Sequence, residues 1–215
     1  MSGGGNEEEQ CQQENIRSSL PVRHKKRFDL QNLRNTEYAM PIIPDPPLSA
    51  YTPHFHTGLV FVTLTGVRGE RIFRRAETAN LLRSVLREVR QKLGFAMHAW
   101  VILPDHSHLL LQPGAEGGGD EIVRRVRRRY AIDYAQLMGS PAEMVVWESH
   151  YGLESVSDEA EFARRIDTVH YDPVRHGLVT RPEEWVQSSY SAWVERGLYK
   201  LGWGWSEPER LVRPK

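Results

Sequence analysis

Apolar and polar residues recur at different periods along the chain, and these periods predict the first elements of the fold. Segment 58–66, GLVFVTLTG, is rich in β-branched and aromatic residues and ends at a glycine, which is typical of a strand. In the next segment apolar residues fall on one face at helical spacing, and Gly94 provides a stop. These apolar residues are Leu82, Val85, Leu86, Val89 and Leu93. The pattern therefore predicts a strand followed by a helix.

Two further apolar segments predict an antiparallel hairpin. They cover residues 95–103, FAMHAWVIL, and residues 106–112, HSHLLLQ. Pro104 and Asp105 separate them and break the first strand. The second strand of this hairpin is the place where polar rings interrupt an otherwise apolar sequence.

The rest of the pattern predicts two helices and one strand. A helix is expected over 121–138 and a short fourth strand over 144–149, MVVWES. A third helix is expected over 158–171, with Ser157 as its N-cap and an acidic first turn that the helix dipole favours. Pro173 is expected to end the regular part of this helix.

The order strand, helix, strand, strand, helix, strand predicts an α+β fold. It is the pattern of a ferredoxin-like antiparallel sheet with helices packed on one face. Residues 1–50 contain a Glu/Gln-rich run, a basic cluster and a proline-rich connector, so they are expected to form a disordered or loosely docked N-terminal tail. The domain is expected to cover 51–203, followed by a C-terminal tail over 204–215.

Composition narrows the classes of function. The 28 Lys and Arg residues balance 28 Asp and Glu residues, which excludes a globally basic nucleic-acid coat but not a local basic patch. No apolar run approaches the roughly 18 residues of a membrane-spanning helix, and the N-terminus lacks the layout of a secretory signal. Cys11 is the single cysteine, so neither an internal disulfide nor a thiolate zinc site is available. We expect a soluble, cytoplasmic protein with no membrane partner.

His106 and His108 are the sharpest candidates for chemistry. Side chains two apart on a strand point to the same face, so both imidazoles can converge on one divalent metal ion. Two polar rings in an apolar strand are costly without such a partner. The alternative is a pair of surface or hydrogen-bonded histidines. His54 and His56 have the same spacing, but they border the N-terminal tail, where histidines need no metal.

The predicted second helix carries a cluster of arginines followed by tyrosines. Such a cluster suits contacts to phosphates, with a tyrosine available to stack on an unpaired base. The alternative is a solvated helix face whose arginine stems cover the edge of the sheet. The candidate residues for nucleic-acid binding are Arg124, Arg125, Arg127, Arg128, Arg129 and Tyr130.

The third helix places two polar residues together. At about 100° per residue, Thr168 and Asp172 lie close to each other on the flank of the face that packs on the sheet. Tyr171 projects nearly opposite to that apolar face.

Several segments resemble the REP-associated tyrosine transposases, relatives of small insertion-sequence single-tyrosine transposases. They are WVILPDHSHLLL, the stretch from WES through DEAEFARRIDTVHYDPVRHGLV, and RPEEWVQSSYSAW, and the resemblance runs from about residue 57 to 203. It implies a ferredoxin-like core, a divalent metal (Mg or Mn) held by His106 and His108, and a helix carrying a tyrosine nucleophile. Members of this family cleave single-stranded DNA beside a hairpin, leaving a 5′-phosphotyrosine link and a free 3′-hydroxyl.

The sequence departs from the family pattern at the nucleophile. The family motif reads Asp-Tyr-Ile-x-x-Asn-Pro-Val, so the tyrosine position falls on Thr168 and the asparagine position on Asp172. Asp172 matches the place of a third metal ligand. An alkoxide from Thr168 is a much poorer leaving group than a phenolate, and Tyr171 is the fallback candidate for the catalytic residue.

We therefore expect a transposase-family DNA-processing protein that binds hairpin or single-stranded DNA. It performs, or once performed, metal-dependent strand cleavage as a single-stranded DNA endonuclease, with Thr168 at the catalytic position. The alternative is a catalytically impaired, domesticated DNA-binding protein of the same fold. A generic RNA-binding module is a third reading on fold grounds, but it would require exposed aromatic residues where this sheet presents histidines.

Overall fold

The computed structural model describes residues 53, 58–141 and 143–212. The predicted N-terminal tail at 1–50, together with His54 and His56, lies outside the described residues. All described residues belong to one of the two units into which the chain divides, Ala39–Lys215.

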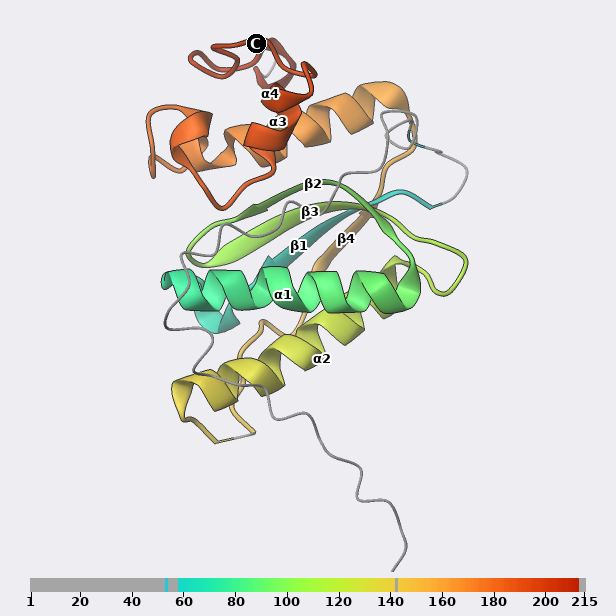
Figure 1. Ribbon diagram of the computed structural model, residues 1–215, viewed down its shortest axis with the longest axis vertical. Coiled ribbons are helices and arrows are strands. Elements are labelled where there is room, and N and C mark those ends of the chain that lie inside the picture. Colours follow the sequence, from blue (N-terminus) through green and yellow to red (C-terminus); the bar gives the residue numbers. More distant parts are fainter. Residues whose placement is uncertain (1–52, 54–57, 142, 213–215) are drawn as a thin grey trace, which may run out of the picture. The chain divides into compact units, whose positions relative to one another are not determined.

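A four-stranded antiparallel sheet forms the centre of the fold, with the strand order β2-β3-β1-β4 (Figure 1). The strands are β1 (Val60–Thr65), β2 (Ala96–Ile102), β3 (His106–Gln112) and β4 (Gly152–Ser155). The predicted hairpin is present as β2 and β3. In the register between β1 and β3, Thr65 lies opposite His106 and Thr63 lies opposite His108. The register brings the end of β1 to the candidate histidines.

Helices α1 (Ala76–Leu93) and α2 (Gly119–Met138) pack on one face of the sheet (Figure 1). The predicted apolar stripe of α1 is buried, and Gly94 ends the helix with a left-handed φ of 65°. The buried stripe of α2 includes residues at every fourth position, which keeps them on one side of the helix. These are Ile122, Val126, Tyr130 and Tyr134. The predicted α+β, ferredoxin-like arrangement is confirmed.

Helix α3 (Glu159–Arg175) and the short helix α4 (Tyr190–Glu195) lie on the opposite face of the sheet (Figure 1). Single 3-10 turns occur after β1 (η4, Val67–Gly69), after α3 (η5, Pro182–Glu184) and near the end of the described chain (η6, Glu209–Leu211). The third helix thus adds a layer to the two-layer core. Within the described part of the chain, no helix is long and apolar enough to cross a membrane.

The prediction of a fourth strand at 144–149 was wrong. This segment forms only an isolated bridge, between Trp147 and Gly66, whereas the fourth strand is the following segment, β4. Its apolar residues are buried as an irregular segment: Val146 and Trp147 are 2% and 7% exposed, and the Trp147 indole donates to the Arg127 carbonyl at 2.9 Å. The segment is apolar because it covers the core beside α2, whereas β4 is an exposed edge strand.

The predicted limits of the third helix also need correction. The N-cap is Asp158 and not Ser157, because the Asp158 carboxylate accepts from the Glu161 backbone N–H at 2.8 Å. Pro173 does not end the helix, which continues to Arg175. Proline removes only one helical hydrogen bond, and the N–H of His176 still donates to the Asp172 carbonyl at 2.9 Å. Asp172 therefore keeps helical geometry, one turn after Thr168.

Candidate metal centre

Two histidines of β3 and one carboxylate of α3 meet on the face of the sheet that α3 covers. Strand alternation points His106 and His108 to this face. Their Nε2 atoms lie 3.3 Å and 3.4 Å from the same oxygen, Oδ2 of Asp172. One ligand atom from each residue lies within 4.8 Å of the other two. The structure thus brings together all three residues that the sequence offered as metal ligands.

The second nitrogen of each imidazole has its own partner. His106 Nδ1 lies 2.7 Å from Oδ1 of Asp105, and His108 Nδ1 lies 3.0 Å from the Thr63 hydroxyl. The His108 ring also stacks on Phe61, with 5.1 Å between centroids. Partners of this kind fix the orientation and tautomer of ligating histidines, leaving the other nitrogen for the metal. Thr63 could not be identified from the sequence, because its contact with His108 depends on strand register.

The two imidazoles differ in their electrostatics. Burial acts to lower the pKa of His106, but hydrogen bonds and charge interactions with Asp172 and Asp105 outweigh it, so the pKa is raised. Burial lowers the pKa of His108 to about 4, with Asp172 opposing the shift. His108 is therefore a neutral imidazole at pH 7, which is the form that binds a metal ion.

The donor set fits a divalent cation. Two imidazole nitrogens and one carboxylate oxygen make a mixed N/O site, and carboxylates suit Mg²⁺ and Mn²⁺ while imidazole suits later transition metals. Asp172 is only 3% exposed, so a cation would also compensate a buried carboxylate. A fourth polar residue lies at the rim: His176 Nε2 is 3.6 Å from Oδ1 of Asp172 and is half exposed. His176 lies one helical turn after Asp172, and this spacing could have identified it from the sequence as a neighbour of the site.

Each of the two candidate nucleophiles has a contact of its own outside the histidine pair. The Thr168 hydroxyl donates to the Arg164 backbone carbonyl at 2.9 Å. Tyr171 lies against the C-terminal segment, where a Cβ at Gly204 would come within 3.7 Å of its Cδ2 atom. Among the described residues, neither hydroxyl forms a hydrogen bond with His106 or His108, whose ring nitrogens are paired with Asp105, Thr63 and Asp172.

The family model described as "Transposase IS200 like" matches residues 55–166. The chain belongs to the IS200-like transposase family. The REP-associated tyrosine transposase of Escherichia coli K12 is 23% identical over 170 residues, covering 77% of this chain and 99% of that protein. A putative REP-associated tyrosine transposase of Haemophilus influenzae is 26% identical over 134 residues, covering 58% of this chain and 76% of that protein.

A solved structure of a REP-associated tyrosine transposase, bound to a REP hairpin, has the same fold. It superposes with a TM-score of 0.59 at 21% identity, covering 74% of this chain and 93% of that one. The resemblance to REP-associated tyrosine transposases drawn from the sequence motifs is confirmed. The match to the IS200-like family model ends before Asp172, so the third candidate ligand lies beyond it.

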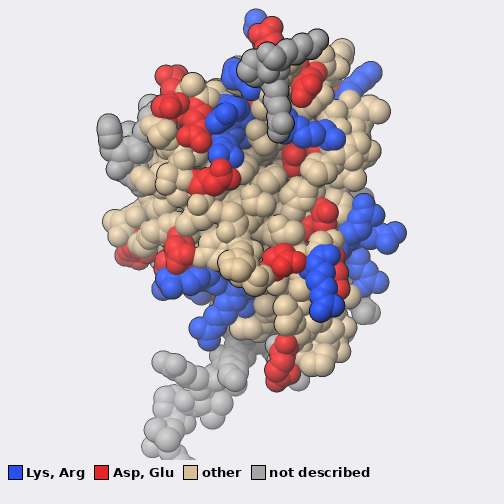
Figure 2. Space-filling view, turned by 180° about the vertical axis from the view of Figure 1, so that it is seen from behind, with Lys and Arg blue, Asp and Glu red and all other residues tan. Residues whose placement is uncertain are grey.

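The arginines of α2 in this IS200-like transposase lie on the helix layer opposite to the candidate metal centre. Most are already paired with acids: Arg124 with Asp120 and Glu121, Arg125 with Glu121, and Arg129 with Asp133 and Glu88. Arg127 donates to the Glu148 carbonyl and covers the Tyr151 ring, while Arg128 is exposed. On the side of the molecule seen in Figure 2, Lys and Arg side chains lie in small groups among Asp and Glu.

Tyr130 is not available to a nucleic-acid base. It is 0% exposed, its hydroxyl donates to the Thr78 carbonyl at 3.3 Å, and its ring lies 4.9 Å from that of Trp147. Tyr130 belongs to the core because it lies four residues after Val126, which itself lies four residues after Ile122, so all three are on one side of the helix. That spacing is visible in the sequence and would have identified it as a core residue.

A buried hydrogen-bond chain ties the C-terminal segment to α3. Asp167 accepts from the Tyr199 hydroxyl at 3.0 Å and pairs with Arg210 at 2.9 Å. His170 Nδ1 lies 3.1 Å from the Tyr199 oxygen, and its Nε2 lies 2.8 Å from the Ser189 hydroxyl. These contacts join residues far apart in the sequence, so they could not be predicted from local sequence patterns. They fix the helix that carries Asp172.

Proposed function

We propose that this IS200-like transposase binds hairpin or single-stranded DNA and holds Mg²⁺ or Mn²⁺ between His106, His108 and Asp172. One observation carries the proposal: both imidazole Nε2 atoms point to a single oxygen of Asp172, at 3.3 Å and 3.4 Å. The DNA partner is supported by the relative whose solved structure contains a REP hairpin.

The chain's own residues supply the orientation of the site. Asp105 and Thr63 hold the two imidazoles, and the buried chain behind α3 holds Asp172. A bound divalent ion would withdraw charge from a scissile phosphate and orient it, without any need to activate water.

The proposed cleavage reaction lacks a tyrosine at the family's nucleophile position. Attack on phosphorus requires a hydroxyl that loses its proton and later leaves again when strands are rejoined, as a tyrosine can do. Thr168 is a poorer group in both roles, and its hydroxyl is engaged with the Arg164 carbonyl. We therefore propose that strand cleavage by the unmodified chain is very weak.

This contact also favours a second candidate function, a DNA-binding protein of the same fold that no longer cleaves. The Thr168 hydroxyl is satisfied within its own helix, and Tyr171 faces Gly204 rather than the histidines. On this reading the metal centre orients a phosphate without any following reaction.

Calorimetry with Mn²⁺ tests the metal centre. His106→Ala should lower Mn²⁺ affinity by at least tenfold, because one of three ligands is lost. His150→Ala is the matched control, since His150 is an exposed histidine whose ring pairs with Ser149. Equal affinity in His106→Ala and His150→Ala would refute the proposed centre.

Incubation with hairpin-bearing single-stranded DNA and Mn²⁺ tests cleavage. We expect no covalent adduct with the unmodified chain and a protein–DNA adduct with Thr168→Tyr. Cleavage by the unmodified chain that is abolished by Tyr171→Phe but not by Thr168→Ala would assign the nucleophile to Tyr171. No cleavage after Thr168→Tyr, with DNA binding intact, would support the binding-only function.

A further inference from the structure

Four arginines are exposed in the segment between β1 and α1, residues 67–75, which we name the arginine loop. Its sequence is VRGERIFRR, so four arginines and one glutamate give a net charge of 4 − 1 = +3. Within the described part of the chain, none of the four side chains forms an ion pair with a carboxylate. They are Arg68, Arg71, Arg74 and Arg75.

The arginine loop is held in a defined conformation. Ile72 and Phe73 are 3% and 4% exposed and insert into the core, so the arginines on either side of them are held at the surface. Arg68 has a φ of 52°, the only positive value of a non-glycine residue in the described chain. Its backbone N–H donates to the Glu148 carboxylate, which fixes this unfavourable turn. A basic loop ordered before it meets a ligand loses little entropy on binding.

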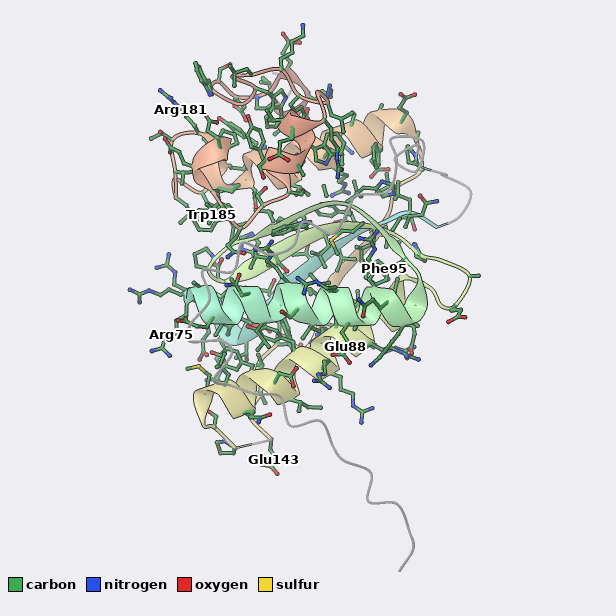
Figure 3. The ribbon with its side chains drawn as sticks, viewed as in Figure 1. Arg75, Glu88, Phe95, Glu143, Arg181 and Trp185 are labelled. Carbon is green, nitrogen blue, oxygen red and sulfur yellow. The ribbon has the colours of Figure 1, made fainter. Side chains whose placement is uncertain are left out.

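The loop also lies against the residues that precede His106. The N–H of Gly66 donates to the Asp105 carbonyl at 2.9 Å, and the N–H of Phe73 donates to the Pro104 carbonyl at 2.8 Å. Figure 3 shows Arg75 extending away from the ribbon at the N-terminal end of α1. The loop therefore borders the end of the sheet where the candidate metal centre begins.

Helix α2 offers a direct contrast. Residues 119–138 contain five arginines and three acids, a net charge of 5 − 3 = +2, yet three of those arginines are already paired with carboxylates. A phosphate must compete with these acids on α2, whereas no described carboxylate forms an ion pair with the arginine side chains of the loop. Phosphates are bound most effectively by arginine forks that are not already occupied.

We infer that the arginine loop binds the phosphate backbone of the DNA strand that enters the candidate metal centre. This inference rests on the proposed function, because it assumes that DNA is the ligand. Contacts to phosphate neutralise charge and carry no direct sequence information, so the loop contributes affinity and register rather than base preference. Nucleic-acid binding by the arginines of α2, which the sequence analysis considered, is the competing outcome.

Fluorescence anisotropy with labelled hairpin DNA over a series of salt concentrations tests the inference. The loop variant carries Arg71→Gln, Arg74→Gln and Arg75→Gln. The matched control carries Arg124→Gln, Arg125→Gln and Arg129→Gln, which removes the same charge from α2. The loop variant should bind at least tenfold more weakly at low salt, with the slope of log K against log salt reduced by about 2 to 3. The control should change affinity less than threefold.

Each outcome distinguishes the two proposals. Equal binding by the loop variant and the unmodified chain, or an equal or larger loss in the α2 control, would overturn the arginine loop as the contact. Absence of DNA binding by the unmodified chain would overturn the proposed function and this inference with it. Circular dichroism and Mn²⁺ calorimetry on the loop variant should match the unmodified chain, and a loss of either would contradict a purely phosphate-binding role.

Discussion

The two faces of the sheet are built from different chemistry. Between the sheet and α1 and α2 lies an apolar cluster, including Leu82, Val85 and Ile122, each at most 2% exposed. Between the sheet and α3 the apolar residues are interrupted by polar groups that are equally buried, among them His170 at 0% and Asp172 at 3%. The first face is mainly an apolar core, whereas the second also holds buried polar groups in and around the candidate site.

Burying polar groups is costly unless they are hydrogen-bonded. The α3 face meets this condition through chains of partners: Asp105 and Thr63 for the candidate ligands, and Tyr199 and Ser189 for His170. The sheet thus separates the apolar core from the face that carries the candidate site. Substitutions on the two faces should therefore affect different measurements.

The largest effect is expected on the apolar face. Leu82→Ala should lower the free energy of unfolding by about 2 to 5 kcal/mol, because it leaves a cavity beside well-packed neighbours. Urea denaturation measures this loss, and calorimetry of the folded variant should give unchanged Mn²⁺ affinity. A comparable fall in Mn²⁺ affinity would show that the two faces are coupled.

Acidification should act through the α3 face. Burial lowers the pKa of His170 to about 3, so below about pH 6.5 the unfolded chain binds a proton that the folded chain does not. The stability due to neutral His170 is present above about pH 6.5 and is lost as the pH falls, by about 2 kcal/mol at pH 5. His108, with a pKa lowered to about 4, acts in the same direction. His106 acts in the opposite direction, because its pKa is raised.

Urea denaturation of metal-free protein at pH 7 and pH 5 measures this effect. His170→Gln cannot titrate, so the difference between its stabilities at the two pH values should be smaller than that of the unmodified chain by about 2 kcal/mol. The same pH dependence in both proteins would remove His170 as the cause.

A smaller effect is expected from the carboxylate behind His106. Asp105→Asn keeps the size of the side chain but removes the charge that orients the ring, so Mn²⁺ affinity should fall about tenfold. Glu143→Gln, a charge-neutralising change on the far side of the sheet, is the control and should leave the affinity unchanged (Figure 3). An Asp105→Asn variant with full affinity would show that the contact at 2.7 Å does not support the site.

The smallest effect is expected at the surface of α2. Arg129→Gln removes ion pairs with Asp133 and Glu88, and such pairs contribute less than about 1 kcal/mol when partly exposed. Thermal unfolding should therefore shift only slightly. A loss of more than about 2 kcal/mol would mean that the arginines of α2 are part of the structural core of that face.

The elements with strong periodicity could be predicted from the sequence. The stripe of α1 and the hairpin of β2 and β3 follow directly from apolar spacing and from Pro104. The fourth strand could not be located, because Val146 and Trp147 are apolar for packing rather than for strand formation, while β4 is an exposed edge. Apolar residues indicate burial, and burial indicates a strand only where the buried backbone is also paired in the sheet, as in β2 but not in 144–149.

The parts of the candidate site that depend on residues close in the sequence could be predicted. Strand alternation was sufficient to place His106 beside His108, and helix spacing combined with the family motif singled out Asp172. Thr63 and Tyr199 were not predictable, because their contacts depend on register and on the path of the C-terminal segment. The prediction that Tyr130 contacts nucleic acid was wrong, because its spacing from Ile122 and Val126 places it in the apolar core.

The residues of the candidate site and the residues that hold it in place are synthesised at different times. All four strands have been synthesised once Ser155 is added, and both candidate histidines are then in the chain. Asp172 follows, but the groups that fix its helix, Tyr199 and Arg210, are among the later residues to be made. Since folding during synthesis proceeds from the N-terminus, the sheet can assemble while the centre still lacks a fixed third ligand. If the centre holds a metal ion as proposed, its third ligand would be fixed only after Tyr199 and Arg210 have been made.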